Sequence, residues 1–464
     1  MKIAFATLGC KVNQYDTAIM EEEAKSISCE IVPFDEEAEI YVINTCTVTG
    51  RSDYQSRQLV RRAFNKNRGC KIVVTGCYAE TGIEELSRMD GVEAIIGNAG
   101  KNNIKRYLEG LKEQKEKSIY VGDKGDKGPI KQPMIKGFDG RTRAFLKVQD
   151  GCDSGCSYCI IPKVRGKSRS LLPDKVIEQA RLFEQAGFKE IVIAGIHLGY
   201  YGKDLLPKID LSDLLTRIVE KTSIPRIRIS SIDPNEVDER LLSLILSSDR
   251  ICRHLHIPIQ SGDDMTLKRM KRGYSSSYYR DLIIHIKERI PDIGIGTDVI
   301  VGFPGEDEEA FENSFRLLGS IPVDFFHVFS FSPRAGTEAA SAPGRVTKVV
   351  IKQRNLVMRD LGRKKGQQFR SKFVGRRLTL LIEDERDQPT GLLKGYSDNY
   401  LKILIEGEDS LKGHLVIVRI NGIKADNLIG SPVSPLNGLT KIASFDTMTK
   451  VLERCRIPGG AFPI

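Results

Sequence analysis

The segment VQDGCDSGCSYCIIP (148–162) holds three cysteines, Cys152, Cys156 and Cys159, within eight residues. They follow AFLKVQ (144–149), an apolar run that reads as a buried strand. A structural zinc site normally has four ligands, and no histidine or further cysteine lies nearby in the sequence to complete such a set. Iron–sulfur clusters are also held by thiolates, usually four. Three thiolates would leave one iron with an open position for a substrate or cofactor, so the segment favours an iron–sulfur site over zinc.

Short apolar segments recur along the chain after this motif. They alternate with stretches of helical period, which is the pattern of parallel α/β folds. Six βα units in about 190 residues predict a partial (β/α)6 barrel, with its chemistry at the carboxyl ends of the strands. The predicted strands of this central part are 144–149, 190–195, 226–231, 254–259, 296–302 and 325–331.

The residues on either side predict two further domains. Before the barrel, apolar runs alternate with helical stretches, which predicts an open parallel sheet. Its predicted strands are 2–7, 40–45, 71–75 and 92–97, and its predicted helices include 17–27 and 56–66. After the barrel, short strands separated by turn residues predict a small all-β module. The predicted domains are the N-terminal sheet at 1–112, a polar linker at 113–140, the barrel at 141–371, the all-β module at 372–434 and a tail without assigned structure at 435–464.

The composition is that of a soluble globular protein, with 40% hydrophobic and 28% charged residues among 464. No run of about 18 uncharged apolar residues is present, so no transmembrane helix is expected. The N-terminus MKIAFATLGC has neither a long apolar core nor a small-residue cleavage site, and we therefore expect a cytoplasmic protein. In that compartment, clustered cysteines indicate metal or redox chemistry rather than disulfides.

The net charge of +10 is concentrated in one stretch. Residues 348–377 contain eleven lysines and arginines and a single acid, Asp360. Such a block suits a phosphate backbone, and it leads directly into the all-β module. The alternative is a solvated helix face, which is the commoner explanation of a charge run.

Three further cysteines each follow a predicted strand of the N-terminal domain. They are Cys10 in TLGCKVNQ, Cys46 in INTCTVT and Cys77 in VTGCYAE. The carboxyl ends of parallel strands in an open sheet form one crevice, where ligands bind. The three cysteines are therefore expected to converge although they lie far apart in sequence. The alternative is three unrelated core cysteines.

Two histidines, His254 and His256, alternate along an apolar predicted strand. One of them is expected to face the core with a satisfied ring nitrogen. Neither is predicted to be catalytic.

The pattern C-x3-C-x-Y-C after the first strand of a partial barrel resembles the radical S-adenosylmethionine (SAM) enzymes. In that family three cysteines hold a 4Fe-4S cluster, and SAM binds the remaining iron through its amino and carboxylate groups. The N-terminal pattern, the barrel and the β module together resemble a methylthiotransferase over residues 1–434. TLGCKVNQYDT and NTCTVT are similar to the threonylcarbamoyladenosine tRNA methylthiotransferases in particular.

The resemblance implies two 4Fe-4S clusters. Cys152, Cys156 and Cys159 would hold the cluster that binds SAM, and Cys10, Cys46 and Cys77 would hold the second. It also implies that the β module is a TRAM domain, which binds RNA. The enzyme would add a methylthio group to C2 of N6-threonylcarbamoyladenosine at position 37 of tRNA, beside the anticodon. Its partners would be tRNA, an electron donor such as flavodoxin or ferredoxin, and a sulfur source.

Other strand ends of the barrel supply candidate SAM contacts. Glycines there let a backbone approach a ligand closely, and the polar side chains offer hydrogen bonds. The family often has glutamate where this chain has Asp233, which keeps the charge on a shorter arm. Ordinary turn chemistry is the alternative for each position. The candidates are Tyr158, Gly195, Ser231, Asp233, Gln260, Ser261 and Gly302.

Candidate RNA contacts lie in and after the basic stretch. Cationic side chains would bind phosphates without reading sequence, and tyrosines would stack on bases. Packing within the β module is the alternative for the tyrosines. The candidates are Lys364, Lys365, Arg376, Arg377, Tyr396 and Tyr400.

Two other functions stay open at this point. A methylthiotransferase acting on N6-isopentenyladenosine in tRNA, or on a ribosomal protein side chain, would use the same clusters. A non-catalytic iron–sulfur protein that binds RNA would keep the basic stretch and the β module. Both cysteine triads are intact, which argues against the second.

Overall fold

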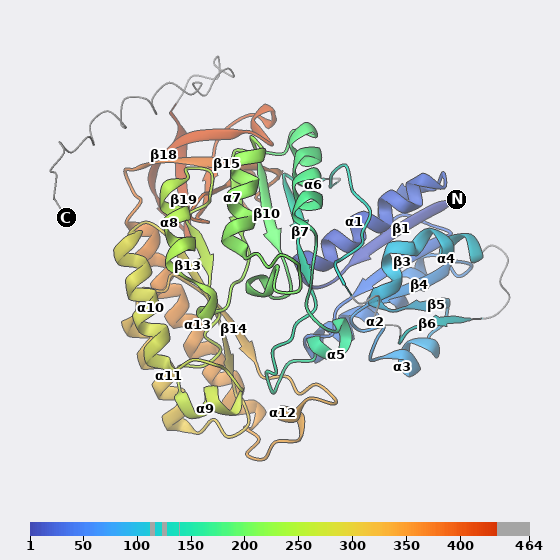
Figure 1. Ribbon diagram of the computed structural model, residues 1–464, viewed down its shortest axis with the longest axis horizontal. Coiled ribbons are helices and arrows are strands. Elements are labelled where there is room, and N and C mark those ends of the chain that lie inside the picture. Colours follow the sequence, from blue (N-terminus) through green and yellow to red (C-terminus); the bar gives the residue numbers. More distant parts are fainter. Residues whose placement is uncertain (112–116, 123–127, 139, 434–464) are drawn as a thin grey trace, which may run out of the picture.

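The computed structural model of the protein describes residues 1–111, 117–122, 128–138 and 140–433. Three bodies follow one another along the chain (Figure 1): an N-terminal parallel sheet with helices, a central set of parallel strands covered by helices, and a C-terminal β-barrel. The predicted α/β class with parallel sheets is confirmed. None of the helices within the described ranges is both long and apolar enough to cross a membrane.

The N-terminal sheet has six strands in the order β2-β1-β3-β4-β5-β6, all parallel. The strands are β1 (Lys2–Thr7), β2 (Glu30–Val32), β3 (Ile40–Thr45), β4 (Lys71–Gly76), β5 (Val92–Ile96) and β6 (Ser118–Tyr120). The helices are α1 (Lys11–Ser26), α2 (Gly50–Lys66), α3 (Ile83–Ser87) and α4 (Ile104–Gly110). From β1 the chain adds β2 on one side of the sheet, and it then returns to add β3 and the later strands on the other side. Such a switch point between β1 and β3 opens a crevice at the carboxyl ends of these two strands.

The sequence pattern missed the two edge strands, β2 and β6. Each has only three residues, too few for a periodic pattern to stand out. Strand β6 lies within the stretch predicted as a linker, and it pairs with β5 through Ser118–Tyr120.

The central strands form two parallel three-stranded sheets, β7-β10-β11 and β12-β13-β14, which follow the chain order. Isolated parallel bridges between Ile227 and Ile251 and between Ser231 and His256 connect them. The strands are β7 (Arg143–Lys147), β10 (Glu190–Ala194), β11 (Arg226–Ile229), β12 (His254–His256), β13 (Gly294–Val301) and β14 (Phe325–Ser330). The short strands β8 (Gln149–Asp150) and β9 (Arg169–Ser170) pair with each other beside the cysteine loop.

Helices cover the outer face of these strands because each has an apolar side that is buried in one large core. The covering helices are α6 (Pro173–Gln185), α7 (Leu211–Lys221), α8 (Glu239–Ser247), α10 (Ser276–Arg289) and α11 (Glu308–Ser320). Short helices in the loops are α5 (Ile161–Arg165), α9 (Asp264–Arg269) and α12 (Glu338–Ser341).

The basic stretch forms the long helix α13 (Lys348–Ser371), which packs on β14 and leads into the C-terminal barrel. The barrel strands are β15 (Arg377–Arg386), β16 (Leu393–Ser397), β17 (Lys402–Ile405), β18 (Leu415–Lys424) and β19 (Asn427–Pro432). They close in the order β15-β16-β17-β19-β18. Phe369 at the end of α13 and Phe373 beyond it are fully buried in the core of this barrel, so helix and barrel form one unit.

Helix α1 belongs to two domains at once (Figure 1). Its Tyr15 and Ile19 are buried in the central core, while Met20 and Ala24 are buried in the core of the N-terminal sheet. The helix therefore fixes the N-terminal sheet against the central strands.

Candidate functional site

The first cysteine triad lies in the loop after β7 and β8. Cys152, Cys156 and Cys159 all line one cavity of about 840 Å³. The loop begins at Gly151, where an added Cβ would lie 1.9 Å from the carbonyl oxygen of Lys167 at a positive φ of 78°. Only glycine fits this turn, because a Cβ would collide with the Lys167 carbonyl and because other residues rarely adopt a positive φ.

Hydrogen-bond donors surround the sulfur atoms of this triad. The Ser154 amide lies 3.4 Å from the Cys152 sulfur, and Arg272 Nη1 lies 3.3 Å from the Cys156 sulfur. His197 Nδ1 lies 3.4 Å from the Cys152 sulfur. Donors to cysteine sulfur stabilise thiolates and tune iron–sulfur clusters. The donor set and the shared cavity fit a cluster with one open iron.

His197 is a site residue that the sequence argument did not single out, although it lies two residues after the predicted barrel strand 190–195. Its Nε2 pairs with Glu236 Oε1 at 2.7 Å. Burial alone would lower the pKa of His197, but its hydrogen bonds to Cys152 and Glu236 raise the pKa to about 9. A signal was available, because a histidine directly after a barrel strand lies where barrel enzymes place their chemistry.

The second triad converges at the switch point of the N-terminal sheet. Cys10 follows β1 at the N-cap of α1, Cys46 follows β3, and Cys77 follows β4. An added Cβ at Gly9 would lie 2.9 Å from the Cys46 Cβ, so the loop before Cys10 runs directly against Cys46. Burial raises the pKa of the Cys46 thiol, and the nearby cysteines Cys77 and Cys10 raise it further. The predicted convergence of the three cysteines is therefore present in the structure.

Two helices begin beside this triad. Helix α1 starts directly after Cys10, and α2 starts at Gly50, four residues after Cys46. The N-terminus of a helix favours negative charge. Two such ends beside three thiols suit an anionic thiolate-bound cluster.

The two triads are in contact through the segment that follows Cys159. Ile160 and Val164 pack on Cys77 in one apolar cluster. Asn98 Nδ2 donates to the Val164 carbonyl at 2.9 Å and lies 3.8 Å from the Cys77 sulfur. The loop of one triad therefore forms part of the wall of the other.

A buried charge network fixes this contact. The Asp16 carboxylate of α1 pairs with Lys101 at 3.0 Å, with Arg165 of α5 at 3.4 Å and with Lys147 of β7. Burial alone would raise the pKa of Asp16, but the three cations outweigh it and hold the pKa well below its usual range. The network ties α1, which starts directly after Cys10, to the short helix α5 that follows Cys159.

A second cavity of about 1120 Å³ extends from Cys10 and Cys46 into the space enclosed by the central strands. It is lined by cationic residues of the N-terminal domain, the central strands and helix α13, and by Tyr400 of the C-terminal barrel. The lining cations are Lys11, Arg51, Arg143, Arg228 and Arg359. The cavity is large enough for a nucleoside and is suited to an anionic group.

Both predicted strand histidines line this cavity, because residues i and i+2 of a strand share a face. His256 Nε2 pairs with Asp298 Oδ1 at 2.8 Å. Of the two, His256 therefore has a satisfied ring nitrogen, whereas His254 is buried and its Nδ1 has no hydrogen bond among the described residues. Burial and nearby cations hold the pKa of His254 well below its usual value, so its ring is neutral.

Three of the candidate SAM contacts lie near one of the two cavities. Tyr158 packs its ring edge-to-face on Phe303, with the ring centroids 6.4 Å apart. Asp233 pairs with Arg272, the donor to Cys156, so its link to the cluster loop runs through that arginine. Ser231 lines the larger cavity.

The other four candidates have packing roles. An added Cβ at Gly195 would meet Leu198 at 2.8 Å, and one at Gly302 would meet Ile351 of α13 at 2.3 Å. Gln260 has a positive φ of 68° and bonds through its backbone to β13. Ser261 is buried, with its hydroxyl 3.2 Å from that of a serine in α11. Turn and packing chemistry accounts for these positions, and a SAM contact there stays a prediction.

Most of the candidate RNA-binding cations already have protein partners. Lys364 pairs at 2.8 Å with the acid one turn earlier in α13, and Lys365 donates to a backbone carbonyl at 2.6 Å just after α11. Arg376 pairs with Asp292, and Arg377 is exposed at the start of β15. An RNA contact by any of them stays a prediction.

The two candidate tyrosines lie between the C-terminal barrel and the central strands. Tyr396 and Tyr400 stack on each other with ring centroids 5.2 Å apart. Arg143 lies over the Tyr396 ring at 5.0 Å, and Arg228 lies over the Tyr400 ring at 4.7 Å. Both tyrosines therefore contribute to the domain contact, and Tyr400 also faces the larger cavity.

Comparison with known proteins agrees with this geometry. The Radical SAM superfamily matches residues 146–318, and the Uncharacterized protein family UPF0004 matches residues 2–97. The Threonylcarbamoyladenosine tRNA methylthiotransferase MtaB of Aquifex aeolicus is 38% identical over 90% of this chain and 100% of its own length. The protein of the same name from Bacillus subtilis is 37% identical over 90% of this chain and 93% of its own length.

This chain belongs to the radical SAM methylthiotransferase family. Within that family its relatives place it in the threonylcarbamoyladenosine tRNA methylthiotransferase branch, as the sequence motifs predicted. The prediction of a transferase that uses SAM and 4Fe-4S clusters is confirmed with it.

Among solved structures, the radical SAM methyltransferase TsrM from Kitasatospora setae aligns with a TM-score of 0.52. The alignment covers 71% of this chain and 74% of that chain at 12% sequence identity. At this identity the likeness concerns the fold alone.

Proposed function

We propose that this protein adds a methylthio group to C2 of N6-threonylcarbamoyladenosine at position 37 of tRNA. The proposal rests on one observation: the two cysteine triads lie in contact through Cys77, Ile160 and Val164, and a cationic cavity of about 1120 Å³ reaches the second triad at Cys10 and Cys46. The relatives that match along nearly the whole chain bear the name of this activity.

We assign the SAM-binding cluster to Cys152, Cys156 and Cys159, because these thiols share a cavity and have nitrogen donors beside them. The second cluster is assigned to Cys10, Cys46 and Cys77 at the switch point. When bound, these groups supply the removal of hydrogen from C2 and the sulfur that replaces it.

The residues of this chain supply orientation and exclusion of water. The larger cavity, which reaches Cys10 and Cys46, would receive the modified base, and its cationic wall would hold an anionic nucleotide in place. The contact of Cys77 with Ile160 and Val164 keeps the two cluster sites at a fixed separation. Radical and sulfur chemistry at one carbon requires such a fixed arrangement.

The C-terminal barrel is assigned the role of a TRAM domain that binds the tRNA. It contributes Tyr400 to the lining of the cavity and is continuous with the basic helix α13. Phosphate contacts there would position the tRNA without reading its sequence. An electron donor such as flavodoxin or ferredoxin and a sulfur source complete the reaction, which would take place in the cytoplasm.

Mass spectrometry of tRNA nucleosides from strains with and without the gene tests the proposal. The 2-methylthio derivative of threonylcarbamoyladenosine is expected to disappear on deletion and to return with the parental gene. Complementation with Cys46→Ala should fail, whereas Cys29→Ala, a buried cysteine after α1, should restore the product. Unchanged product in the deletion strain, or loss of the isopentenyl derivative instead, contradicts the assignment.

A further inference from the structure

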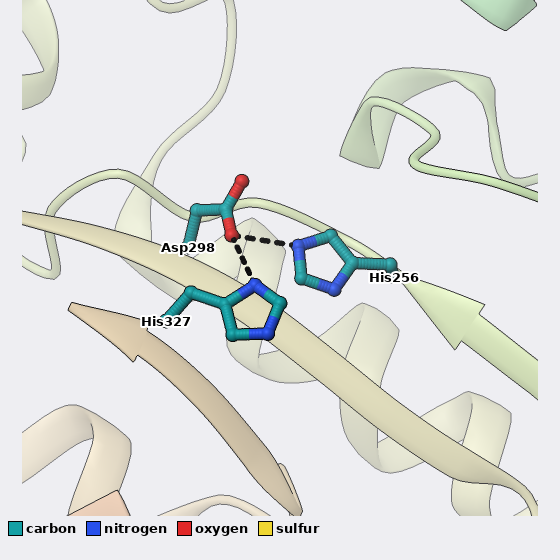
Figure 2. A group of neighbouring side chains, drawn as sticks. All are labelled: His256, Asp298 and His327. Carbon is teal, nitrogen blue, oxygen red and sulfur yellow. Dashed lines mark hydrogen bonds and ion pairs between the residues drawn. The ribbon is translucent and has the colours of Figure 1, made fainter. Parts of the chain in front are cut away.

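Two histidines and one aspartate converge on the wall of the larger cavity (Figure 2). His256 Nε2 lies 2.8 Å from Asp298 Oδ1, and His327 Nδ1 lies 3.2 Å from the same oxygen. All three ligand atoms lie within 4.8 Å of one another. Ligand atoms bound to one first-row metal at 2.0–2.2 Å lie about 3 to 3.5 Å apart. The three side chains are thus already near the spacing of a metal-binding set.

Three neighbouring parallel strands present these side chains. His256 ends β12, Asp298 lies in β13, and His327 lies in β14, where it pairs directly with Asp298. The strand neighbour of His256 is Gly296, and an added Cβ there would lie 2.6 Å from the His256 ring nitrogen Nδ1. The glycine leaves the ring room to cross β13 and reach Asp298. The triad therefore stands on a rigid sheet rather than on loops.

The electrostatics of the cavity make the position of Asp298 unusual. It is the single acid among the described residues that line the cavity, and the lining includes five lysines and arginines. Its side chain is 24% exposed and the side chain of His327 is 63% exposed, so both are open to a ligand in the cavity. A carboxylate there would repel an anionic substrate unless a cation lay between them.

We propose that His256, Asp298 and His327 bind a divalent first-row transition-metal ion, and that its open positions bind the carboxylate of the threonylcarbamoyl group. The second half rests on the proposed function. Two imidazoles and one carboxylate are a donor set for such ions, and three protein ligands leave positions free for a substrate. The carboxylate of the threonine moiety is a hard anionic ligand, whereas an isopentenyl group has no atom that binds a metal. The site would therefore select the substrate branch.

Titration of the holoenzyme, with its clusters assembled, tests the metal site. Free Mn²⁺ is measured by its room-temperature electron paramagnetic resonance signal, and one Mn²⁺ per chain should be retained. Substitutions His256→Ala and His327→Gln should each weaken Mn²⁺ binding at least tenfold at unchanged iron content. His327 is exposed, so its variant is expected to fold even if His256→Ala does not. His285→Ala, at an exposed histidine on α10, is the matched control and should bind Mn²⁺ as the parent does.

Binding of tRNA tests the role of the metal. The holoenzyme with Mn²⁺ should bind tRNA carrying threonylcarbamoyladenosine more tightly than the same tRNA with unmodified adenosine. That preference should disappear in His327→Gln and after chelation of Mn²⁺. Equal Mn²⁺ retention in parent and variants overturns the metal site. A preference that survives loss of the metal overturns the carboxylate role.

The same measurements separate this inference from the proposed function. If the parent retains Mn²⁺ through the triad but shows no preference for the modified tRNA, the metal site stands and the carboxylate role fails. If the deletion strain keeps its 2-methylthio product, the proposed function fails, while Mn²⁺ retention still decides the metal site.

Discussion

Replacing Asp16 by asparagine is expected to loosen the N-terminal sheet from the central strands. The Asp16 carboxylate is 3% exposed and is shared by Lys101, Lys147 and Arg165. Asparagine keeps the size of the side chain and removes its charge. The perturbation therefore acts on the ion pairs and leaves the surrounding packing nearly unchanged.

The structure sets the expected magnitude. Removing one member of a buried ion pair costs about 3–5 kcal/mol, because the remaining charge is left without compensation. We expect the lower end of this range, since Asp150 still pairs with Arg165 at 2.7 Å and lies 3.7 Å from Lys147. A loss of about 3 kcal/mol raises the population of the opened interface roughly 100-fold, because 1.36 kcal/mol corresponds to a factor of ten.

Amide hydrogen exchange followed by mass spectrometry measures this opening locally, which suits a protein of several domains. Protection of peptides from α1 and α5 should fall roughly 100-fold in Asp16→Asn, while peptides from the C-terminal barrel stay unchanged. Asp35→Asn is the matched control, because Asp35 forms an exposed pair with Arg62 on the surface of the same domain. Equal protection of α1 in both variants would show that the network does not hold the interface.

Three other substitutions test separate parts of the structure. Cys46→Ser should lower the iron content from about eight to about four atoms per chain, and Cys29→Ser should leave it unchanged. Gly76→Ala should lower the melting temperature more than Gly413→Ala. Both glycines have a positive φ, but an added Cβ at Gly76 would lie 2.4 Å from the Thr45 carbonyl oxygen, whereas one at Gly413 would have no heavy atom within 4 Å. Glu190→Gln should release the C-terminal barrel to limited proteolysis, because buried Glu190 pairs with two arginines that donate to the barrel backbone.

Glu190 also predicts how the stability of the contact between the C-terminal barrel and the central strands changes with pH. Burial alone would raise its pKa, but Arg228 and Arg226 outweigh burial and lower the pKa below its ordinary value of 4.5. A carboxyl with a lower pKa in the folded state stabilises the fold above the unfolded pKa, and this contribution is lost as the pH falls. Protection of the barrel contact should therefore weaken below about pH 4.5 in the parent and change less in Glu190→Gln. An identical pH profile for both proteins would contradict this reasoning.

The local patterns in the sequence were sufficient for the strands and for the first triad. Cys152, Cys156 and Cys159 lie so close together that one loop brings them to the same cavity. The strands of both α/β domains were predicted because buried parallel strands read as apolar runs between turns. The short edge strands at 30–32 and 118–120 were not predicted, because three residues are too few to show a periodic pattern of apolar side chains.

Roles that depend on contacts between segments far apart in the sequence were not predicted as well. His197 was not predicted as a site residue, because its contact with Cys152 is fixed by Glu236, a residue far away in the sequence that pairs with its other ring nitrogen. Tyr396 and Tyr400 were considered for base stacking, yet they stack on each other between two domains. Such roles depend on which surfaces meet, and a single chain segment carries no information on that.

By itself the sequence determined the class of the protein and six cysteines as its candidate cluster ligands. The spacing of the cysteines and their position at the ends of strands are properties of short segments, and they identify these thiols as the candidate cluster ligands. Only the tertiary structure decided that the two triads share a wall, and that His256, Asp298 and His327 meet across three strands. Strand order and register decide which side chains become neighbours, and both result from the packing of the whole chain.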